Sequence, residues 1–211
     1  MRDFKKEGIE INWSVGSDYL RELKKEAFVY IFRTPKMRPD LDVITQARMR
    51  GSIITSEIEL FVQLCPAQIF GVTGSDGKTT TTTLIAEMLK EEGYKVHLGG
   101  NIGTPLLDQI EKIKSSDKVV LELSSFQLMT MSQSPNVSVV TNISPNHLDY
   151  HNSYQEYIDA KRNVFLHQGI TDHLIVNAEN VITSLFQDEH KGYLSVFSSS
   201  SVPAFSTTDQ R

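Results

Sequence analysis

The chain contains a series of short apolar runs that are rich in β-branched side chains. Five of them are QIFGV (68–72), KVHLGG (95–100), KVVLEL (118–123), VSVVTNI (137–143) and HLIVNA (173–178). Runs that are apolar at almost every position are typical of strands buried on both faces of a parallel sheet. Helical patterns separate several of them. The pattern predicts a doubly wound α/β domain with a parallel sheet, in which ligands bind at the carboxyl ends of the strands.

An earlier part of the chain shows the same alternation. AFVYIFRTP (27–35) is predicted as a strand that ends in a proline turn, and LDVITQARMRG (41–51) as a helix that ends at Gly51. SIITSEIELFVQLC (52–65) is predicted as a short strand that runs into a helix. We therefore expect a partial, Rossmann-like N-terminal domain over residues 1–67 and a central domain over residues 68–211, with one more possible strand near SVF (195–197).

Composition narrows the class of protein. The net charge of −5 argues against nucleic acid as the main partner. A single cysteine excludes an intrachain disulfide, and no apolar run approaches the roughly 20 residues that cross a bilayer. The first residues lack the apolar region of a signal peptide. We expect a cytoplasmic protein that contacts neither membrane nor nucleic acid.

The segment GVTGSDGKT (71–79) follows a predicted strand and opens a predicted helix. Backbone N–H groups in such a loop can surround phosphate oxygens, a lysine can reach the β- and γ-phosphates, and a threonine hydroxyl can bind Mg²⁺. The spacing departs from the strict Walker pattern, and a glycine-rich turn with a solvated lysine is the alternative. We predict an ATP-binding P-loop, which also explains a run of five threonines at a helix start. Its residues are Gly74, Ser75, Asp76, Gly77, Lys78, Thr79 and Thr80.

Three further groups are expected to project toward the same edge of the predicted sheet. Glu122 interrupts an apolar run, and a buried carboxylate requires an ion-pair partner or a bound cation. His147 follows the next strand in TNISPNHLDYH, where a structural histidine is the alternative. Lys161 lies on the apolar stripe of a helix for which Ser153 and Glu156 predict a capping box. An inward lysine either extends its amine to solvent, finds a partner, or loses its proton and becomes able to form a carbamate with CO₂.

A second glycine-rich turn occurs in LGGNIGTPLLDQI (98–110), where we expect a strand followed by a helix start near Thr104 and Pro105. Such a helix N-terminus would bind an anion, for example the diphosphate of an acceptor. A tight strand-to-helix turn is the alternative.

Five segments together resemble the Mur ligases: GVTGSDGKTT, GGNIGTP, LELSSFQL, TNISPNHLDYH and YIDAKRNVF. TPKMRPDL and SEIELF also resemble the end of that family's N-terminal domain. The similarity covers nearly the whole chain and weakens after Asn180. The loop alone would also fit folylpolyglutamate synthases, whereas GNIG with LELSSFQL indicates the branch that adds D-glutamate.

The resemblance implies an ATP-dependent acid–amino-acid ligase of peptidoglycan biosynthesis. Its substrates would be UDP-N-acetylmuramoyl-L-alanine and D-glutamate, joined through an acyl phosphate. By similarity, Lys78, Glu122, His147 and Lys161 would be catalytic. Thr79 and Glu122 would hold one Mg²⁺, and His147 with a carbamylated Lys161 a second. The substrate-binding residues implied in this way are Gly100, Asn101, Ser124, Gln127 and Asp149.

The resemblance also implies missing parts. The family's first uridine-binding strand, the end of the central domain and the C-terminal domain find no counterpart in this sequence. We therefore expect a fragment that is inactive alone, from a protein that is monomeric at full length. A nucleotide-binding module without ligase activity and a P-loop kinase of a small metabolite are the alternatives.

Overall fold

The computed structural model describes residue 8 and residues 10–200, and it divides the chain into two compact units. The first unit spans Met1–Thr55 and the second Ser56–Arg211. Helix α3 (Glu57–Leu64) therefore belongs to the second unit, although the sequence pattern placed it ahead of a boundary at residue 67.

The first unit is a small α/β arrangement. It contains α1 (Arg21–Lys25), β1 (Tyr30–Phe32), α2 (Asp42–Met49) and β2 (Ile53–Thr55), and the two strands pair in parallel. The predicted strands and helix are confirmed, and the φ angle of +95° at Gly51 shows why a glycine ends α2. The buried apolar residues that form its core are Ile31, Ile44 and Ala47.

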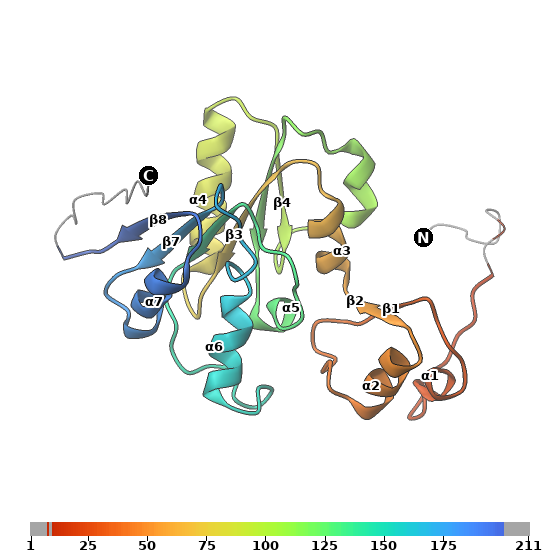
Figure 1. Cartoon of the computed structure of the whole chain (residues 1–211). Helices are drawn as coiled ribbons and strands as arrows, with labels where there is room; N and C mark the ends of the chain where they lie inside the picture. Colours follow the sequence, from red (N-terminus) through yellow and green to blue (C-terminus); the bar gives the residue numbers. More distant parts are fainter. Residues whose placement is uncertain (1–7, 9, 201–211) are drawn as a thin grey trace. The chain divides into compact units, whose positions relative to one another are not determined.

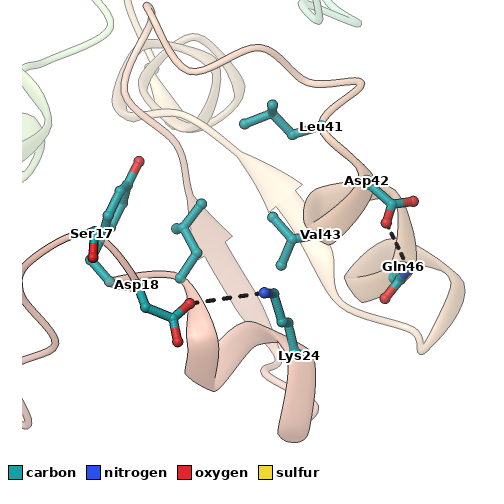
Figure 2. Close-up of a pocket in the computed structure, with 9 residues that line it drawn as sticks. Ser17, Asp18, Lys24, Leu41, Asp42, Val43 and Gln46 are labelled. Carbon is teal, nitrogen blue, oxygen red and sulfur yellow. Dashed lines mark hydrogen bonds and ion pairs between the residues drawn. The ribbon is translucent and has the colours of Figure 1, made fainter.

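A surface cavity of about 450 Å³ lies in this unit, beside α1 and α2 (Figure 2). Lys24 Nζ lies 3.8 Å from Asp18 Oδ1, and Gln46 Nε2 donates to Asp42 Oδ2 at 3.0 Å. Four of the polar side chains drawn there, Asp18, Lys24, Asp42 and Gln46, thus form two pairs.

The second unit is built on a six-stranded, wholly parallel sheet with strand order β4-β5-β3-β6-β7-β8. All five strands that the apolar runs predict are confirmed, and a sixth covers the possible strand near residue 195. The strands are β3 (Gln68–Thr73), β4 (Val96–Gly100), β5 (Lys118–Glu122), β6 (Val137–Val140), β7 (His173–Asn177) and β8 (Tyr193–Phe197).

Helices connect these strands (Figure 1). α4 packs against β3, β4 and β5, α3 packs against the 3₁₀ helix η2, and α5 lies beside α6. Because helices and connecting segments cover the sheet, its central strands are apolar at almost every position. Besides α3, the described helices of the second unit are α4 (Lys78–Glu91), η2 (Leu107–Lys112), α5 (Ser125–Leu128), α6 (Tyr154–Arg162), α7 (Val181–Leu185) and η3 (Phe186–Glu189).

The strand order places the loops after β3 and β6 next to each other. From β3 the chain goes to one side of the sheet, to β4 and β5, and it then returns to β6 on the other side of β3. The Thr141 N–H donates to Thr73 O at 3.0 Å just beyond the paired strands. Such a switch point is where doubly wound sheets bind ligands, so a site is expected at this edge of the sheet.

Two local predictions need correction. No α-helix begins at Thr104 and Pro105, because the chain forms only the 3₁₀ helix η2, two residues later. At the start of α6, Ser153 Oγ accepts the Glu156 N–H as expected. The Glu156 side chain, however, accepts the backbone N–H of Asn152 at 2.7 Å instead of that of Ser153, so the predicted capping box is only half formed.

Within the described residues, no helix is both long and apolar enough to cross a bilayer.

Candidate nucleotide site

Two glycines shape the loop between β3 and α4. Gly74 has a φ angle of +154°, and a Cβ atom there would lie 1.8 Å from Thr141 Oγ1. Gly77 has a φ angle of +77° and occupies the N-cap position of α4. A side chain at Gly74 would collide with the neighbouring loop, and one at Gly77 would strain the backbone.

The N-terminus of α4 faces the loop with unpaired backbone amides. Its first helical hydrogen bond is donated by Thr81 to Gly77 O at 3.0 Å. The N–H groups of Lys78, Thr79 and Thr80 precede that bond, so they remain available to an anion. Thr82 is buried and its hydroxyl donates to Lys78 O at 2.7 Å, which gives this threonine a packing role.

The amides of Ser75 and Asp76 already have acceptors. The Ser75 N–H donates to Asn142 O at 2.9 Å, and the Asp76 N–H donates to Asn142 Oδ1 at 3.0 Å. Ser75 Oγ lies 2.9 Å from Ser144 O and 2.8 Å from the hydroxyl of Tyr157. These contacts hold the loop, and a direct role of Ser75 and Asp76 in binding ATP stays a prediction.

The Lys78 side chain folds back over the loop. Its Nζ donates to Gly74 O and to Ser75 O, both at 2.9 Å. These acceptors are neutral carbonyls, and no salt bridge among the described residues pairs this ammonium at the helix N-terminus with a carboxylate. The charge and the helix dipole both favour an anion at this position.

Glu122, the last residue of β5, contacts both the first turn of α4 and the residue that follows β4. Its carboxylate is 2% exposed and accepts hydrogen bonds from Thr79 Oγ1 at 2.6 Å and Asn101 Nδ2 at 2.7 Å. Gly100 has a φ angle of +90°, and a Cβ there would lie 2.1 Å from Glu122 O. The structure therefore brings together four predicted site residues, and their arrangement depends on a glycine at position 100.

The Glu122 site fits a divalent cation. Both donors to the buried carboxylate are neutral, and a buried charge is costly without a counter-charge. The Thr79 hydroxyl and the Glu122 carboxylate supply adjacent oxygen atoms, which are the ligands that Mg²⁺ prefers. Across the described residues, no three His, Cys, Asp or Glu side chains gather at one point. A cation here would therefore also need oxygen atoms from a ligand such as a nucleotide.

Lys161 is directed into the protein and contacts the same loop. It is 2% exposed, and its Nζ donates to Gly74 O at 2.8 Å and to Thr73 Oγ1 at 3.3 Å. Nζ also lies 4.8 Å from the ring centroid of Tyr157. Burial, reinforced by the charge of Lys78, lowers the pKa of Lys161 to about 7. The alternative in which the amine extends to solvent is therefore wrong.

The remaining predicted residues are less closely connected. His147 is exposed and has a φ angle of +53°, and its ring centroid lies 4.9 Å from that of Phe126 in a tilted arrangement. Among the hydrogen bonds and ring contacts of the described residues, none joins His147 directly to Lys161. Asp149 is also exposed.

Ser124 and Gln127 form a capping box for α5. Ser124 Oγ accepts the Gln127 N–H at 3.3 Å, and Gln127 Oε1 accepts the Ser124 N–H at 2.9 Å. These contacts give both residues a structural role, and substrate binding by either stays a prediction. The same pattern of a serine followed three residues later by a glutamine was a signal that the sequence analysis missed.

A comparison with protein families places residues 72–206 in the Mur ligase middle domain. This match covers well over half of the 211 residues. The chain belongs to the Mur ligase family. Its sequence also matches those of curated proteins named UDP-N-acetylmuramoylalanine--D-glutamate ligase. It is 58% identical to that of Acetivibrio thermocellus over 195 residues, and 57% identical to that of Ruminiclostridium cellulolyticum over 191 residues. Those alignments cover 92% and 90% of this chain, but 41% of each relative.

Solved structures agree on the fold of this Mur ligase chain. A UDP-N-acetylmuramoyl-L-alanyl-D-glutamate--2,6-diaminopimelate ligase superposes with a TM-score of 0.57 at 18% identity, over 93% of this chain and 52% of that one. A UDP-N-acetylmuramate-alanine ligase from Thermotoga maritima superposes with a TM-score of 0.51 at 27% identity, over 80% and 38%. The predicted α/β class with a parallel central sheet is thus confirmed.

Proposed function

We propose that this chain is the nucleotide-binding part of an ATP-dependent ligase that joins D-glutamate to UDP-N-acetylmuramoyl-L-alanine in peptidoglycan biosynthesis. The observation that carries the proposal is the convergence of Lys78, Thr79 and Glu122 at the switch point of the sheet, in a chain 58% identical to a ligase of that name. The substrates come to this chain through its relatives, of which it spans 41% of the length.

The proposed reaction transfers the γ-phosphoryl group of ATP to the acceptor carboxylate. The resulting acyl phosphate is attacked by the amine of D-glutamate, which forms the amide and releases phosphate. Two anions must approach each other in the first step, so positive charge is required where they meet. The Lys78 ammonium and the first amides of α4 supply it, while Gly100 and Asn101 would bind the acceptor's diphosphate and sugar.

Thr79 and Glu122 would hold Mg²⁺, which when bound neutralises charge on the transferred phosphoryl group. A second Mg²⁺ would depend on His147 and on a carbamate of Lys161. The neutral Lys161 amine forms such a carbamate by attacking the carbon of CO₂ and releasing a proton. The pKa of about 7 makes that neutral amine available near neutral pH. The carbamate adds an anionic oxygen ligand beside the loop.

Family membership disfavours the kinase alternative, because a Mur ligase traps its phosphorylated acceptor with an amine. The non-catalytic nucleotide-binding module remains the alternative for the chain by itself, since the relatives are longer. We place the reaction in the cytoplasm, where its nucleotide substrates are available, and we expect the full-length enzyme to be monomeric, with neither nucleic acid nor membrane as a partner.

A chimeric ligase tests the proposal. This chain replaces the matching segment of the Acetivibrio thermocellus relative, and phosphate release is measured with UDP-N-acetylmuramoyl-L-alanine, ATP and a panel of D- and L-amino acids. We expect release that depends on D-glutamate, its loss in the Lys78→Ala chimera, and none from the chain alone. Release indifferent to D-glutamate, or a stable phosphorylated acceptor, would contradict the proposal.

A further inference from the structure

One asparagine after β6 pairs with the backbone of the phosphate loop. Asn142 Oδ1 accepts the Asp76 N–H at 3.0 Å, and Asn142 Nδ2 donates to Asp76 O at 3.1 Å. The backbone O of Asn142 accepts the Ser75 N–H at 2.9 Å. A side-chain amide that engages both polar groups of one residue acts as a neighbouring β-strand would, and it fixes the orientation of the adjacent peptide groups.

Thr141 reinforces this contact. Its Oγ1 donates to Asp76 O at 2.6 Å, and the same atom lies against Gly74, where only a hydrogen fits. The loop is therefore held at three consecutive positions, from Gly74 to Asp76, by two consecutive residues of a different strand's end.

The segment that holds the loop is itself hydrogen-bonded to two further asparagines. Asn177 Nδ2, at the end of β7, donates to Thr141 O at 3.0 Å. Asn180 accepts the Ile143 N–H through Oδ1 at 3.3 Å and donates to Ile143 O through Nδ2 at 3.1 Å. Asn142 thus connects the loop to a segment that is itself hydrogen-bonded to residues at and after the end of β7.

We propose that Asn142 is a positioning residue for nucleotide binding: it holds Ser75 and Asp76 so that the phosphates are bound by the amides of Gly77, Lys78, Thr79 and Thr80. The inference rests on the proposed function and adds a residue to its site. Glycines at positions 74 and 77 give the backbone of this loop access to many conformations, and ordering such a backbone on binding opposes affinity. Because Asn142 orders the loop before the nucleotide binds, less conformational entropy is lost on binding. Asn142 therefore strengthens binding without contacting the nucleotide.

The test measures Mg·ATP affinity by isothermal titration calorimetry with the 211-residue chain and its variants. Asn142→Ala removes both side-chain hydrogen bonds, and we expect the dissociation constant to rise about ten-fold. Asn142→Asp cannot donate to Asp76 O and adds negative charge near the phosphates, so we expect a larger rise. A dissociation constant within about two-fold of the unsubstituted chain in both variants would overturn the inference.

Asn136→Ala is the matched control. Asn136 Oδ1 accepts the Ile69 N–H at 2.9 Å and its Nδ2 donates to Asp172 Oδ1 at 3.3 Å, at the opposite end of β3. This variant should lower the thermal midpoint as Asn142→Ala does while leaving Mg·ATP affinity unchanged. If it weakens binding as much as Asn142→Ala, the effect is general destabilisation and the inference is wrong.

Amide hydrogen exchange on the unsubstituted chain tests the inference even if the variants fail to fold. The Ser75 and Asp76 amides should be protected before nucleotide is added, and the Gly77–Thr80 amides should become protected only with Mg·ATP. Free exchange at Asp76 in the absence of nucleotide would overturn the inference. If the chain binds no Mg·ATP at all, the proposed function fails, while protection at Asp76 still reports whether Asn142 holds the loop.

Discussion

At the scale of single residues, the site depends on two buried charged side chains, Glu122 and Lys161, and on the side-chain amide of Asn142. Glu122 and Lys161 could be predicted because a charge within an apolar pattern is conspicuous, and both are buried at the site. Asn142 could not be predicted, because the residue it pairs with, Asp76, is 66 positions away and it bonds to backbone atoms that any residue type would present. The contact depends on the strand order, which periodicity alone does not determine.

The buried amine of Lys161 should make stability depend on pH. Its pKa is about 7 in the folded chain, against 10.5 for the ordinary side chain. Below pH 7 both states are protonated and burial of the charge fully opposes folding. Between the two values the unfolded chain binds more protons, so the free energy of unfolding rises with pH, by up to about 1.4 kcal/mol per unit.

We therefore expect Lys161→Met to remove this slope. Urea denaturation of both chains at pH 7.5, 8.5 and 9.5 measures it as the difference in free energy of unfolding between variant and unsubstituted chain. As pH rises, the free energy of unfolding of the unsubstituted chain should increase steadily relative to that of Lys161→Met. A constant difference over this range would show that Lys161 does not titrate there.

Glu122→Gln should separate the charge of this side chain from its shape. The amide oxygen can still accept the Thr79 hydroxyl, but the new NH₂ group cannot accept Asn101 Nδ2, so we expect the free energy of unfolding to fall by about 1–3 kcal/mol. The gain in ATP affinity on adding Mg²⁺ should fall at least about ten-fold, because a neutral oxygen is a weaker ligand. Glu57→Gln is the control, since Glu57 Oε1 accepts the Leu107 N–H at 3.0 Å near η2. An unchanged Mg²⁺ effect in Glu122→Gln would contradict the assigned role.

At the scale of elements, apolar runs predicted the strands, whereas tight turns decided the helix starts. Strands buried on both faces have a distinct pattern, so all five expected strands were found. The segment after Asn101 was expected to start an α-helix, but it forms the short η2, because the turn back from Gly100 and Gly103, both with positive φ, delays the helix. The outcome there depends on backbone geometry that residue type indicates only weakly.

The two loop glycines should differ in their sensitivity to substitution. Gly74→Ala places a Cβ 1.8 Å from Thr141 Oγ1 and should cost roughly 3 kcal/mol or more of unfolding free energy. Gly77→Ala meets no atom within 4 Å, so only backbone strain of about 1–2 kcal/mol applies. Denaturation of both variants measures the difference, and equal losses would show that the contact with Thr141 is not tight.

At the scale of the whole molecule, each unit has its own core. The apolar cluster of the second unit draws only on residues from Ile58 onward, and that of the first only on residues up to Ile54. We expect residues 56–211 alone to unfold cooperatively, with a midpoint within about 3 °C of the main transition of the whole chain. Calorimetry checks this, and failure of the shorter chain to fold would show that the second unit depends on the first.

In the proposed site, Mg·ATP binds at the carboxyl edge of the sheet, between Lys78 and Glu122. The most direct measurement is NMR of the ¹⁵N-labelled chain with Mn·ATP, because Mn²⁺ broadens the signals of nearby amides. We expect broadening centred on Thr79, Gly100 and Glu122, and its loss in Lys78→Ala. Broadening centred on Ala67 and Asn136, at the opposite edge of the sheet, or none at all, would contradict it.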